Sequence, residues 1–475
     1  MSTGRMIKNP FILTIFGATG DLSRKKIFPA LLALFKQNLL SEEFHIFAVG
    51  RRASSDNEFK VLLSSHLEKS DVSTLEKFLG KISYVCGDLE SEEVYRELYR
   101  RIHDTEQQLS GECLSKLYYM ALTPELLPKT VEQMGKAGLH IGCGEEGKWS
   151  RIIVEKPFGK DLASAKRLNE LLREYFIEEQ IYRIDHYLGK ELVQTILSVR
   201  FANAMFYPLL NKDYIERIEI VAAEEIGIED RGVFYDQTGA LRDFVQSHLL
   251  QIIALVTMDE PRAFEADILR DAKSEALRAL RFFDTETICT DIVHAQYEGY
   301  RQELYVHPDS LTETYIAFKT YMDLPAWRGV PIYVQHGKKM ARRETAVHFV
   351  FKPHCGMLYC DRPTELRQDV RENVLSILLS PREGFRLQAN VKKVGFGTGL
   401  RGVDLNYSYS ETDDNIPDAY ERLLMDAMNG DQSLFIRSDE IEASWQWIDK
   451  IMALWETHKP ELYFYPPGTN PTLLR

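Results

Sequence analysis

The sequence has fewer basic residues than acidic ones, 58 against 71, and no long apolar run. Over 475 residues the net charge is −13 at pH 7, so general attraction to the phosphate backbone of a nucleic acid is not expected. No apolar run approaches the roughly 20 residues that span a bilayer. These absences exclude broad nucleic-acid binding and membrane insertion. Any anion must be bound by a local group of basic side chains.

Cysteine is also scarce. The six cysteines are scattered and form no Cys-x-x-Cys pair. His354, Cys355 and Cys360 would supply only half of a metal site. We therefore expect isolated thiols, no bound metal and a reducing, cytoplasmic location. The short polar stretch 1–10 leads into an apolar run that stops at a glycine turn, which is not the pattern of a signal peptide.

The first third of the chain alternates strand and helix patterns. Apolar runs of strand length occur at 11–16, 44–49, 82–85, 117–122 and 151–154, and an amphipathic helix pattern follows the first run at 22–40. This alternation predicts an α/β, Rossmann-like domain with a parallel sheet covered on both faces.

The pattern changes after about residue 190. Several of the later strand-like segments alternate apolar with polar residues, as in an antiparallel sheet covered on one face. We place the two domains at 1–186 and 187–475. The later strand-like segments lie at 218–221, 312–321, 330–335, 346–351, 374–379 and 385–391, and two helix patterns at 418–428 and 440–455 close the chain.

The first apolar run ends in a glycine turn that could bind a dinucleotide. Gly17, Thr19 and Gly20 precede Asp21 and Leu22 at the start of the helix pattern. Glycines let the backbone turn sharply and approach a pyrophosphate, whose charge then lies at a helix N-terminus. The motif has two glycines rather than the full three. An ordinary strand–helix turn capped by Asp21 is the alternative, but the position after the first strand favours a cofactor site.

Two arginines indicate which dinucleotide is bound. In NAD-specific folds an acidic residue near the end of the second strand binds the ribose 2′-hydroxyl, whereas an arginine accommodates the 2′-phosphate of NADP. No acid occurs between Phe44 and Asp56, and Arg51 and Arg52 follow the strand pattern. We therefore predict NADP as the cofactor, with Arg51 as the 2′-phosphate ligand and Arg52 as the alternative.

The densest group of chemically active side chains is RIDHYLGK at 183–190. His186, Tyr187 and Lys190 offer three hydrogen-bond donors to a phosphate, and Lys190 would lie one helical turn after His186 if a helix begins here. The alternative is that Asp185 caps a helix and the rest is a solvated surface. The grouping nevertheless meets the need of an acidic protein for a local anion site.

A histidine in a second group could be a general base. Removal of a hydride from a hemiacetal carbon requires a base for the hydroxyl proton, and histidine titrates near neutrality. His248 lies five residues after Asp243 in an expected helix, which is more than one turn, so the two need not face the same way. Its neighbours Leu249 and Leu250 leave a buried core histidine as the alternative.

Three further residues lie near strand ends or turns. Lys156 follows the strand pattern RIIV, where open α/β sheets bind ligands. Glu224 follows the strand pattern at 218–221, and Lys338 lies in the segment HGKK. Each of the three has a plain surface explanation when taken alone.

Several segments, taken in their order and spacing, resemble the glucose-6-phosphate dehydrogenases. The resemblance covers most of the chain and is strongest over 11–260. The segments are GATGDLSRKK at 17–26, VEKPFGKDL at 154–162, RIDHYLGKE at 183–191, RDFVQSHLLQ at 242–251, RFAN at 200–203 and IEDRGVFYD at 228–236.

The resemblance implies a fold and an activity. The fold is a Rossmann-like domain followed by a β+α domain with a large, mainly antiparallel sheet. The activity is oxidation of glucose 6-phosphate at C1 to 6-phosphogluconolactone, the first step of the pentose phosphate pathway, with hydride transfer to NADP⁺. A homodimer or homotetramer assembled through the sheet domain is implied as well.

The resemblance also implies residue roles. His248 would take the C1 hydroxyl proton, and Asp185 would orient it. The sugar phosphate would be bound by His186, Tyr187, Lys190 and Lys338; the sugar hydroxyls by Lys156, Glu224 and Asp243, with Lys156 also near the nicotinamide; and the cofactor by Gly17, Thr19, Gly20, Asp21, Leu22 and Arg51. Gln335 and Glu344 stand where members with a second, structural NADP⁺ carry basic residues, so we expect no second cofactor.

Two other functions fit parts of the sequence. The Glu-Lys-Pro segment after a strand also resembles the glucose–fructose oxidoreductase group, whose substrates often carry no phosphate. The cluster of His186, Tyr187 and Lys190 argues against that group. A nucleotide-binding regulator without activity is the other possibility, and the presence of Asp185, His186, Lys190 and His248 together argues against it.

Overall fold

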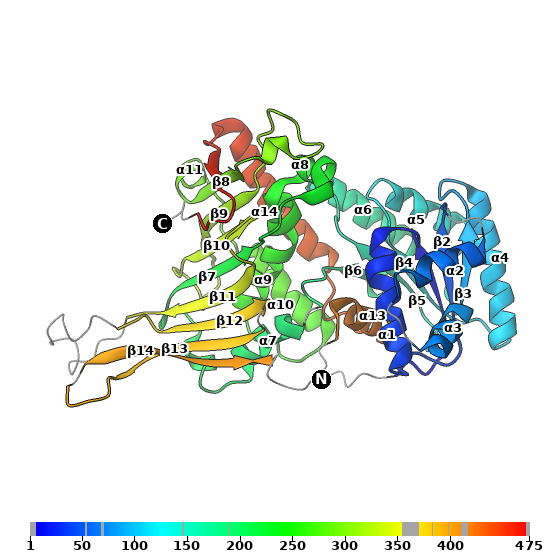
Figure 1. Ribbon diagram of the computed structural model, residues 1–475, viewed down its shortest axis with the longest axis horizontal. Helices are drawn as coiled ribbons and strands as arrows, with labels where there is room; N and C mark the ends of the chain where they lie inside the picture. The colour runs from blue at the N-terminus through cyan, green and yellow to red at the C-terminus, as the bar shows by residue number, and fades with distance from the viewer. Residues whose placement is uncertain are drawn as a thin grey trace. The chain divides into compact units, whose positions relative to one another are not determined.

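The computed structural model describes residues 6–52, 55–67, 71–144, 147–189, 191–353, 370–381, 383–397, 399–409 and 417–471. Contacts divide the chain into two compact units (Figure 1). The first unit comprises residues 1–190, 265–270 and 417–442, and the second comprises 191–264, 271–416 and 443–475. Each unit is described by itself below.

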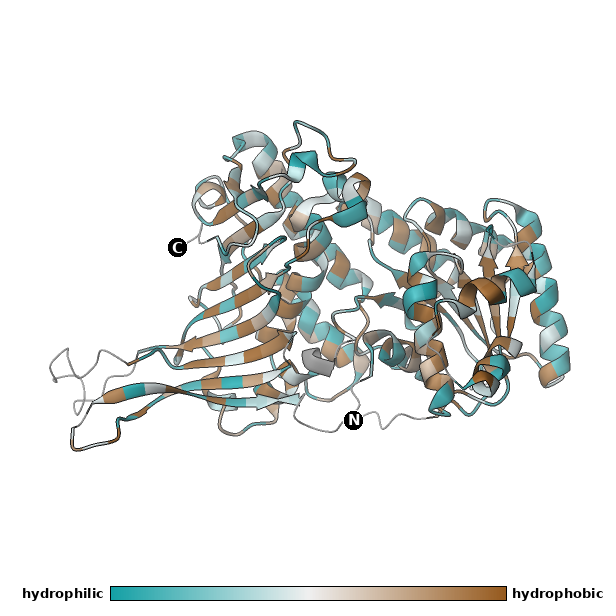
Figure 2. Ribbon diagram, in the orientation of Figure 1, coloured by the Kyte–Doolittle hydropathy of each residue, from teal (hydrophilic) through white to brown (hydrophobic). Residues whose placement is uncertain are grey.

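The first unit is built on a parallel sheet of six strands in the order β3-β2-β1-β4-β5-β6. The direction of strand succession reverses between β1 and β4, which is the position where open α/β sheets bind ligands. The central strands are buried, and Figure 2 shows them as hydrophobic. The strands are β1 (Phe11–Phe16), β2 (Phe44–Gly50), β3 (Ile82–Cys86), β4 (Ser115–Met120), β5 (Ser150–Glu155) and β6 (Ile181–Ile184).

Helices cover this sheet. The helices form two groups (Figure 1). In one group α1 contacts both α3 and α13, and in the other α5 contacts both α4 and α6. The predicted Rossmann-like, parallel α/β architecture is therefore confirmed. The elements are the π-helix η1 (Ser23–Ile27), α1 (Phe28–Lys36), α2 (Asp56–Ser64), α3 (Val72–Gly80), α4 (Glu92–Leu109), α5 (Leu126–Lys136), α6 (Leu162–Tyr175), the 3₁₀ helix η2 (Glu178–Gln180) and α13 (Ala419–Asn429).

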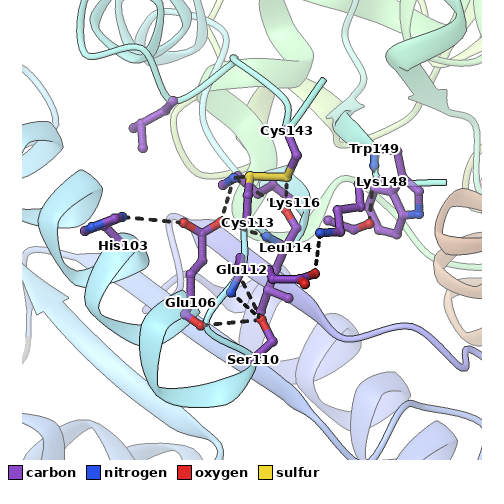
Figure 3. Close-up of a disulfide and its surroundings, with 12 residues drawn as sticks. His103, Glu106, Ser110, Glu112, Cys113, Leu114, Lys116, Cys143, Lys148 and Trp149 are labelled. Carbon is purple, nitrogen blue, oxygen red and sulfur yellow. Dashed lines mark hydrogen bonds and ion pairs between the residues drawn. A yellow bond between two sulfur atoms is a disulfide. The ribbon is translucent and has the colours of Figure 1, made fainter. Parts of the chain in front are cut away.

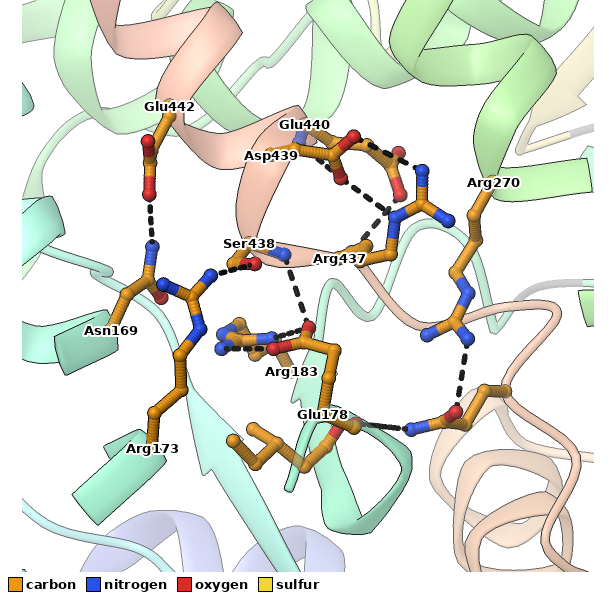
Figure 4. Close-up of polar contacts among 12 residues, drawn as sticks. Asn169, Arg173, Glu178, Arg183, Arg270, Arg437, Ser438, Asp439, Glu440 and Glu442 are labelled. Carbon is orange, nitrogen blue, oxygen red and sulfur yellow. Dashed lines mark hydrogen bonds and ion pairs between the residues drawn. The ribbon is translucent and has the colours of Figure 1, made fainter. Parts of the chain in front are cut away.

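A late segment of the chain belongs to the first unit and is fastened along β6. The guanidinium of Arg183, which is buried, pairs with Glu178, and Glu178 accepts a hydrogen bond from the Ser438 backbone N–H (Figure 4). The Ile436 N–H donates to the Arg183 carbonyl at 3.1 Å. Arg173 donates to the Ser438 hydroxyl (Figure 4). These contacts fix the strand that leads directly into Asp185.

The first unit contains a disulfide, which corrects the expectation of isolated thiols. Cys113 and Cys143 are joined, with Cα atoms 5.6 Å apart (Figure 3). The bond links the turn before β4 to the segment before β5, 30 residues later in the chain. Cys86 and Cys289 are free and exposed. The possible half-site of His354, Cys355 and Cys360 lies outside the described residues.

The second unit contains a nine-stranded sheet in the order β14-β13-β12-β11-β7-β10-β9-β8-β15. Its pairs are antiparallel except β10 with β7 and β15 with β8, so the predicted large, mainly antiparallel sheet is confirmed. The strands are β7 (Ile215–Ala223), β8 (Ile292–Tyr297), β9 (Tyr315–Thr320), β10 (Ile332–Gly337), β11 (Glu344–Phe351), β12 (Val374–Ser380), β13 (Gly384–Lys392), β14 (Leu400–Ser408) and β15 (Tyr463–Tyr465).

Three consecutive helical segments in this unit differ in hydrogen-bonding period, and the first is interrupted by non-helical backbone at Gly239. The segments are α8 (Gly232–Ala240), the π-helix η5 (Leu241–Leu249) and α9 (Leu250–Thr257). Single π-helical turns occur frequently at functional sites. The other helices are α7 (Glu191–Phe201), α10 (Ala266–Arg278), α11 (Thr287–Thr290), α14 (Ser438–His458) and the 3₁₀ helices η3 (Tyr207–Leu209), η4 (Glu229–Arg231) and η6 (Tyr300–Gln302). The first residues of α10, up to 270, and of α14, up to 442, belong to the first unit.

The core of the second unit includes a cluster rich in tyrosine. Tyr235, Tyr297, Tyr300, Tyr315 and Tyr465 are all buried in it. Their rings fill the space beside the sheet, while their hydroxyls need polar partners. Within the described parts of the chain, no helix is long and apolar enough to cross a membrane.

Candidate active site

The glycine turn lies at the reversal point of the parallel sheet. β1 ends level with Val49 of β2 and Met120 of β4. The N–H groups of Gly17 and Ala18 both donate to the Val49 carbonyl at 3.0 Å. Gly17 has a φ of +78°, and a Cβ there would lie 2.1 Å from the carbonyl oxygen of Ala121. Only glycine fits this turn, which therefore has the backbone geometry of a dinucleotide site.

The other residues of the turn have separate surroundings. Thr19 is buried, Leu22 is half-buried and Asp21 is exposed. Asp21 accepts hydrogen bonds from Lys25 at 3.0 Å and Arg24 at 2.6 Å. These two contacts, the one with Lys25 first, hold the pKa of the Asp21 carboxyl below its usual value. Asp21 is thus ionised and engaged with side chains of the first helical turn, rather than capping the helix backbone.

Three more predicted residues follow neighbouring strands at the same edge of the sheet. Arg51 is exposed directly after β2, and Lys156 is half-buried directly after β5. Asp185 is buried directly after β6. Because the carboxyl ends of parallel strands lie on one edge of a sheet, these residues share that edge with the glycine turn. Arg52 is also exposed, so both candidates for the 2′-phosphate ligand are accessible.

The segment after Asp185 forms a turn rather than the start of a helix. The Tyr187 N–H donates to Oδ1 of Asp185 at 2.9 Å, and the Leu188 N–H donates to the Asp185 carbonyl at 2.9 Å. The rings of His186 and Tyr187 lie 5.1 Å apart. The next helix begins at Glu191, so the one-turn helical spacing considered for Lys190 does not apply. Lys190 itself lies outside the described residues.

In the second unit, Asp243 and His248 lie on the π-helix η5. Both side chains are buried. A π-helix joins residues five apart by its hydrogen bonds, so the five-residue spacing brings the two positions closer to one face than an α-helix would. Arg231 donates to Asp243 at 3.1 Å, and the Ser247 hydroxyl donates to the Asp243 carbonyl at 3.2 Å.

Glu224 and Lys338 are ion-paired beside this helix. The Lys338 ammonium lies 2.6 Å from Oε2 of Glu224 and 5.2 Å from the ring centroid of Tyr235. The two residues follow β7 and β10, which are parallel neighbours. The pKa of the Glu224 carboxyl lies below its usual value: burial opposes ionisation, and the ion pair with Lys338 favours it. Glu224 is therefore a carboxylate at neutral pH.

The sequence patterns did not single out several residues that support this group. Arg231 pairs with Asp243, Tyr235 lies under Lys338, and Phe244 contacts the ring of His248. His336 reaches this group through its stack on Phe244. His336 is the first residue of the segment HGKK. It is two residues after Val334 on β10, and this alternation was the available signal that both side chains lie on the same, buried face of the strand. Phe244 could not be placed without knowing that its helix is π-helical.

The two units therefore offer two kinds of chemistry. The edge of the parallel sheet combines a glycine turn with an exposed arginine, and these residues fit the pyrophosphate and 2′-phosphate of NADP. The second unit offers a histidine, two carboxylates and a lysine, which suit proton transfer and binding of a polyhydroxylated anion.

Comparisons with known proteins give a consistent result. Residues 14–195 match the NAD-binding domain of glucose-6-phosphate dehydrogenase, and residues 197–472 match its C-terminal domain. A glucose-6-phosphate 1-dehydrogenase of Treponema pallidum (strain Nichols) is 38% identical over 480 residues, which cover 97% of this chain and 92% of the relative.

Solved structures agree over nearly the same length. A glucose-6-phosphate dehydrogenase in complex with its substrate glucose 6-phosphate has a TM-score of 0.89 and 32% identity, covering 100% of this chain and 97% of the other. Glucose-6-phosphate 1-dehydrogenase of Mycobacterium avium has a TM-score of 0.81 and 36% identity, covering 97% of this chain and 95% of the other.

Proposed function

Since the chain belongs to the glucose-6-phosphate dehydrogenase family, we propose that it oxidises glucose 6-phosphate at C1 to 6-phosphogluconolactone with NADP⁺. The single observation that carries this proposal is the match of both domains of the family over residues 14–195 and 197–472. The reaction is the first step of the pentose phosphate pathway. Functionally, we assign residues 1–186 to the cofactor domain and 187–475 to the substrate and assembly domain.

We assign the proton transfer to His248. As the C1 hydroxyl becomes a carbonyl, its proton must leave as the hydride leaves the same carbon, and a neutral imidazole can take that proton. We assign to Asp185 the role of the carboxylate that fixes the imidazole tautomer and stabilises the imidazolium. Burial of His248 supports this role, because a buried base is shielded from bulk water.

We assign the remaining candidates to binding. Cationic and hydroxyl donors suit a sugar phosphate, whereas carboxylates suit sugar hydroxyls. The sugar phosphate is assigned to His186, Tyr187, Lys190 and Lys338, and the sugar hydroxyls to Lys156, Glu224 and Asp243.

The cofactor is assigned to the first unit. The turn of Gly17, Thr19, Gly20, Asp21 and Leu22 would hold the pyrophosphate, Arg51 would hold the 2′-phosphate, and Lys156 would lie near the nicotinamide. Bound NADP⁺ supplies the hydride acceptor. We propose no second, structural NADP⁺, in keeping with Gln335 and Glu344.

Absorbance of the reduced nicotinamide tests the activity directly. Purified enzyme is given glucose 6-phosphate or glucose, each with NADP⁺ or NAD⁺. We expect fast reduction with the phosphorylated sugar and NADP⁺, and a His248→Asn enzyme slower by about 10²–10⁴-fold. Turnover with glucose alone would instead place the chain with sugar oxidoreductases of unphosphorylated substrates. Binding of both ligands without turnover would support a regulator.

The cofactor preference needs its own variants. We expect Arg51→Ala to raise the KM for NADP⁺ by about 10-fold or more, as loss of a charge-assisted contact does, and to change the KM for NAD⁺ little. Arg52→Ala is the matched variant one residue away. If Arg52→Ala alone weakens NADP⁺ binding, Arg52 is the 2′-phosphate ligand instead.

We propose that the protein is a homodimer or homotetramer assembled through the second unit's sheet. Leu405 and Tyr407 on β14 are exposed, and exposed apolar side chains on a sheet favour burial against a partner. A hollow of 430 Å³ on the same sheet is lined by Tyr315, Tyr333 and Gln335, among others. Light scattering coupled to size-exclusion chromatography tests the assembly, and a monomer at micromolar concentration would contradict it.

We further propose a cytoplasmic location. The free, exposed thiols of Cys86 and Cys289 favour a reducing compartment, since oxidising compartments tend to pair exposed thiols. The disulfide between Cys113 and Cys143 counts in the other direction. Subcellular fractionation decides, and recovery from an oxidising compartment would contradict the proposal.

A further inference from the structure

The second unit contains a buried histidine that none of the assigned roles uses. His336 lies on the strand β10, two residues before Lys338, and is 0% exposed. Its Nδ1–H donates to the carbonyl oxygen of Ala222 on the neighbouring strand β7 at 2.8 Å. Because a carbonyl can only accept, this bond fixes the proton on Nδ1. Burial lowers the pKa of His336 to about 4, so the ring is neutral at pH 7.

The ring of His336 packs face to face on Phe244. Their centroids are 3.8 Å apart, and the ring planes differ by 9°. Phe244 lies on the π-helix η5, and its ring in turn meets the ring of His248 at 5.0 Å with an interplanar angle of 77°. His336, Phe244 and His248 thus form a continuous line of aromatic contacts within one compact unit, anchored to the sheet at Ala222.

We propose that His336 is a positioning residue that fixes the ring of His248 through Phe244. A base must be held within a few tenths of an ångström of its productive position, and rings locked by packing do this. The stacked contact sets the plane of Phe244, and the edge-to-face contact limits rotation of His248. The hydrogen bond to Ala222 adds stability at this position but is not needed for the stack.

The proposal explains why a histidine, rather than an aliphatic residue, occupies this core position. An aliphatic side chain would fill the space but would impose no plane on Phe244. The Nε2 atom of His336 is buried and has no hydrogen-bond partner among the described residues. Leaving such an atom unpaired is unfavourable, so packing alone would favour a fully apolar ring. A ring with a donor at Nδ1 satisfies both the stack and the Ala222 carbonyl.

This inference rests on the proposed role of His248 as the base, and the variants separate the two. His336→Phe keeps the ring and removes the donor, whereas His336→Asn keeps a donor and removes the ring. We expect His336→Asn to lower kcat by about 10- to 100-fold, the cost of a misplaced catalytic group, with the KM for NADP⁺ unchanged. His336→Phe should retain kcat within about threefold, even if its thermal midpoint falls.

A matched control is available in the same unit. His294 on β8 is buried, and its ring contacts Trp455 at 4.6 Å. Its ring contact is tilted by 37°, and His294 is not part of the line of contacts from His336 through Phe244 to His248. We expect His294→Asn to lower the thermal midpoint while kcat per folded enzyme stays unchanged, which separates loss of packing from loss of positioning.

Combination with His248→Asn provides the decisive measurement. If His336 acts through His248, then adding His336→Asn to His248→Asn lowers kcat no further. Independent, multiplying effects would overturn the proposal, as would equal losses of kcat in His336→Phe and His336→Asn. A slow His248→Asn enzyme with a normal His336→Asn enzyme would overturn this inference alone. A His248→Asn enzyme with unchanged kcat would overturn the base assignment and, with it, this inference.

A second variant protects the test against misfolding. Should His336→Asn fail to fold, Phe244→Leu breaks the same contacts from the helix side. We expect it to lower kcat by the same factor. A folded Phe244→Leu enzyme with normal kcat would contradict the proposal.

Discussion

The ammonium of Lys338 lies 2.6 Å from the carboxylate of Glu224. Lys338 is only 4% exposed, so the pair is largely removed from water. A buried cation that is already neutralised can bind a second anion only in competition with its partner. The pair therefore couples stability to substrate affinity, and variants can separate the two effects.

We expect Lys338→Met to raise the KM for glucose 6-phosphate by about 10- to 100-fold with a smaller change in kcat. The physical reason is loss of a charge-assisted contact, worth roughly 1.5–3 kcal/mol. It should also lower stability by about 1–3 kcal/mol, because Glu224 loses its partner. Steady-state kinetics and thermal unfolding measure the two effects.

The double variant Lys338→Met with Glu224→Gln is the control for pairing. It should recover most of the lost stability but none of the affinity for the sugar phosphate. An unchanged KM in Lys338→Met would show that Lys338 is no phosphate ligand and only neutralises Glu224.

Gly17 provides a test of the cofactor turn. In Gly17→Ala the new Cβ would meet the Ala121 carbonyl at 2.1 Å with φ at +78°, so the ends of β1 and β4 must move apart. We expect NADP⁺ binding to weaken by at least about 10-fold, because the backbone of this turn approaches the pyrophosphate. Titration of NADPH fluorescence measures the affinity, and circular dichroism confirms that the variant is folded.

Gly111→Ala is the control that separates backbone strain from a steric clash of the new Cβ. Gly111 has a φ of +71°, but no atom lies within 4 Å of a Cβ built there. It should lose only about 1–2 kcal/mol of stability, the cost of left-handed backbone, with unchanged NADP⁺ affinity. If both variants bind NADP⁺ normally, the turn is no cofactor site.

The sequence was sufficient for the strands whose burial is uniform. The run at 11–16 matches β1 (Phe11–Phe16) because every residue is buried and a glycine turn ends it. β4 was placed two residues too late, at 117–122. It begins at Ser115, and its second residue, Lys116, is buried only because it pairs with Glu106 at 2.8 Å. A search for apolar runs does not detect a polar strand residue, even where that residue is buried.

Other features depend on contacts that no local pattern records. β14 was missed because none of its residues is buried and, among the described strands, it pairs with β13 alone. The π-helical turn that carries Asp243 and His248 could not be foreseen from an α-helical period. The residues 417–442 pack into the first unit through contacts with residues about 250 positions earlier, such as Ile436 with Arg183.

The buried carboxyl group of Glu313 should make the stability of the protein depend on pH. This group is buried and accepts a hydrogen bond from the Leu241 N–H at 2.8 Å, at the start of η5. Burial raises the pKa of Glu313 to about 7, against 4.5 for the free side chain. Between these values the folded protein keeps a proton that the unfolded chain has released. Stability therefore falls as the pH rises through this window, by up to roughly 3 kcal/mol.

Glu313→Gln should remove this contribution. The amide carbonyl can still accept from Leu241, but it never ionises. We expect thermal midpoints close to wild type at pH 5 and higher than wild type at pH 8. Glu92→Gln, which changes an exposed carboxylate on α4, should leave the pH dependence as it is. Parallel curves for Glu313→Gln and wild type would show that Glu313 titrates normally.

Because of the disulfide, we expect a reductant to lower the stability of the protein without changing its activity. Cys113 and Cys143 enclose β4 and α5 in a loop with a separation of 30 residues. Closing a loop of that length stabilises the folded state by roughly 3–4 kcal/mol in the chain-entropy model. Both cysteines precede their strands, so the bond lies at the opposite edge of the parallel sheet from the glycine turn. We therefore expect dithiothreitol to lower the thermal midpoint and leave kcat and the KM for NADP⁺ unchanged.

The joined pair can be distinguished from the free thiols by substitution. Cys113→Ser with Cys143→Ser should unfold at the lower, reduced midpoint and should no longer respond to dithiothreitol. Cys86→Ser and Cys289→Ser, at exposed free thiols, should still respond as wild type does. A wild-type midpoint that is the same with and without reductant would mean that the bond adds no stability. In that case the ion pair of Glu106 with Lys116 beside it (Figure 3), rather than the sulfur bridge, holds the start of β4 in place.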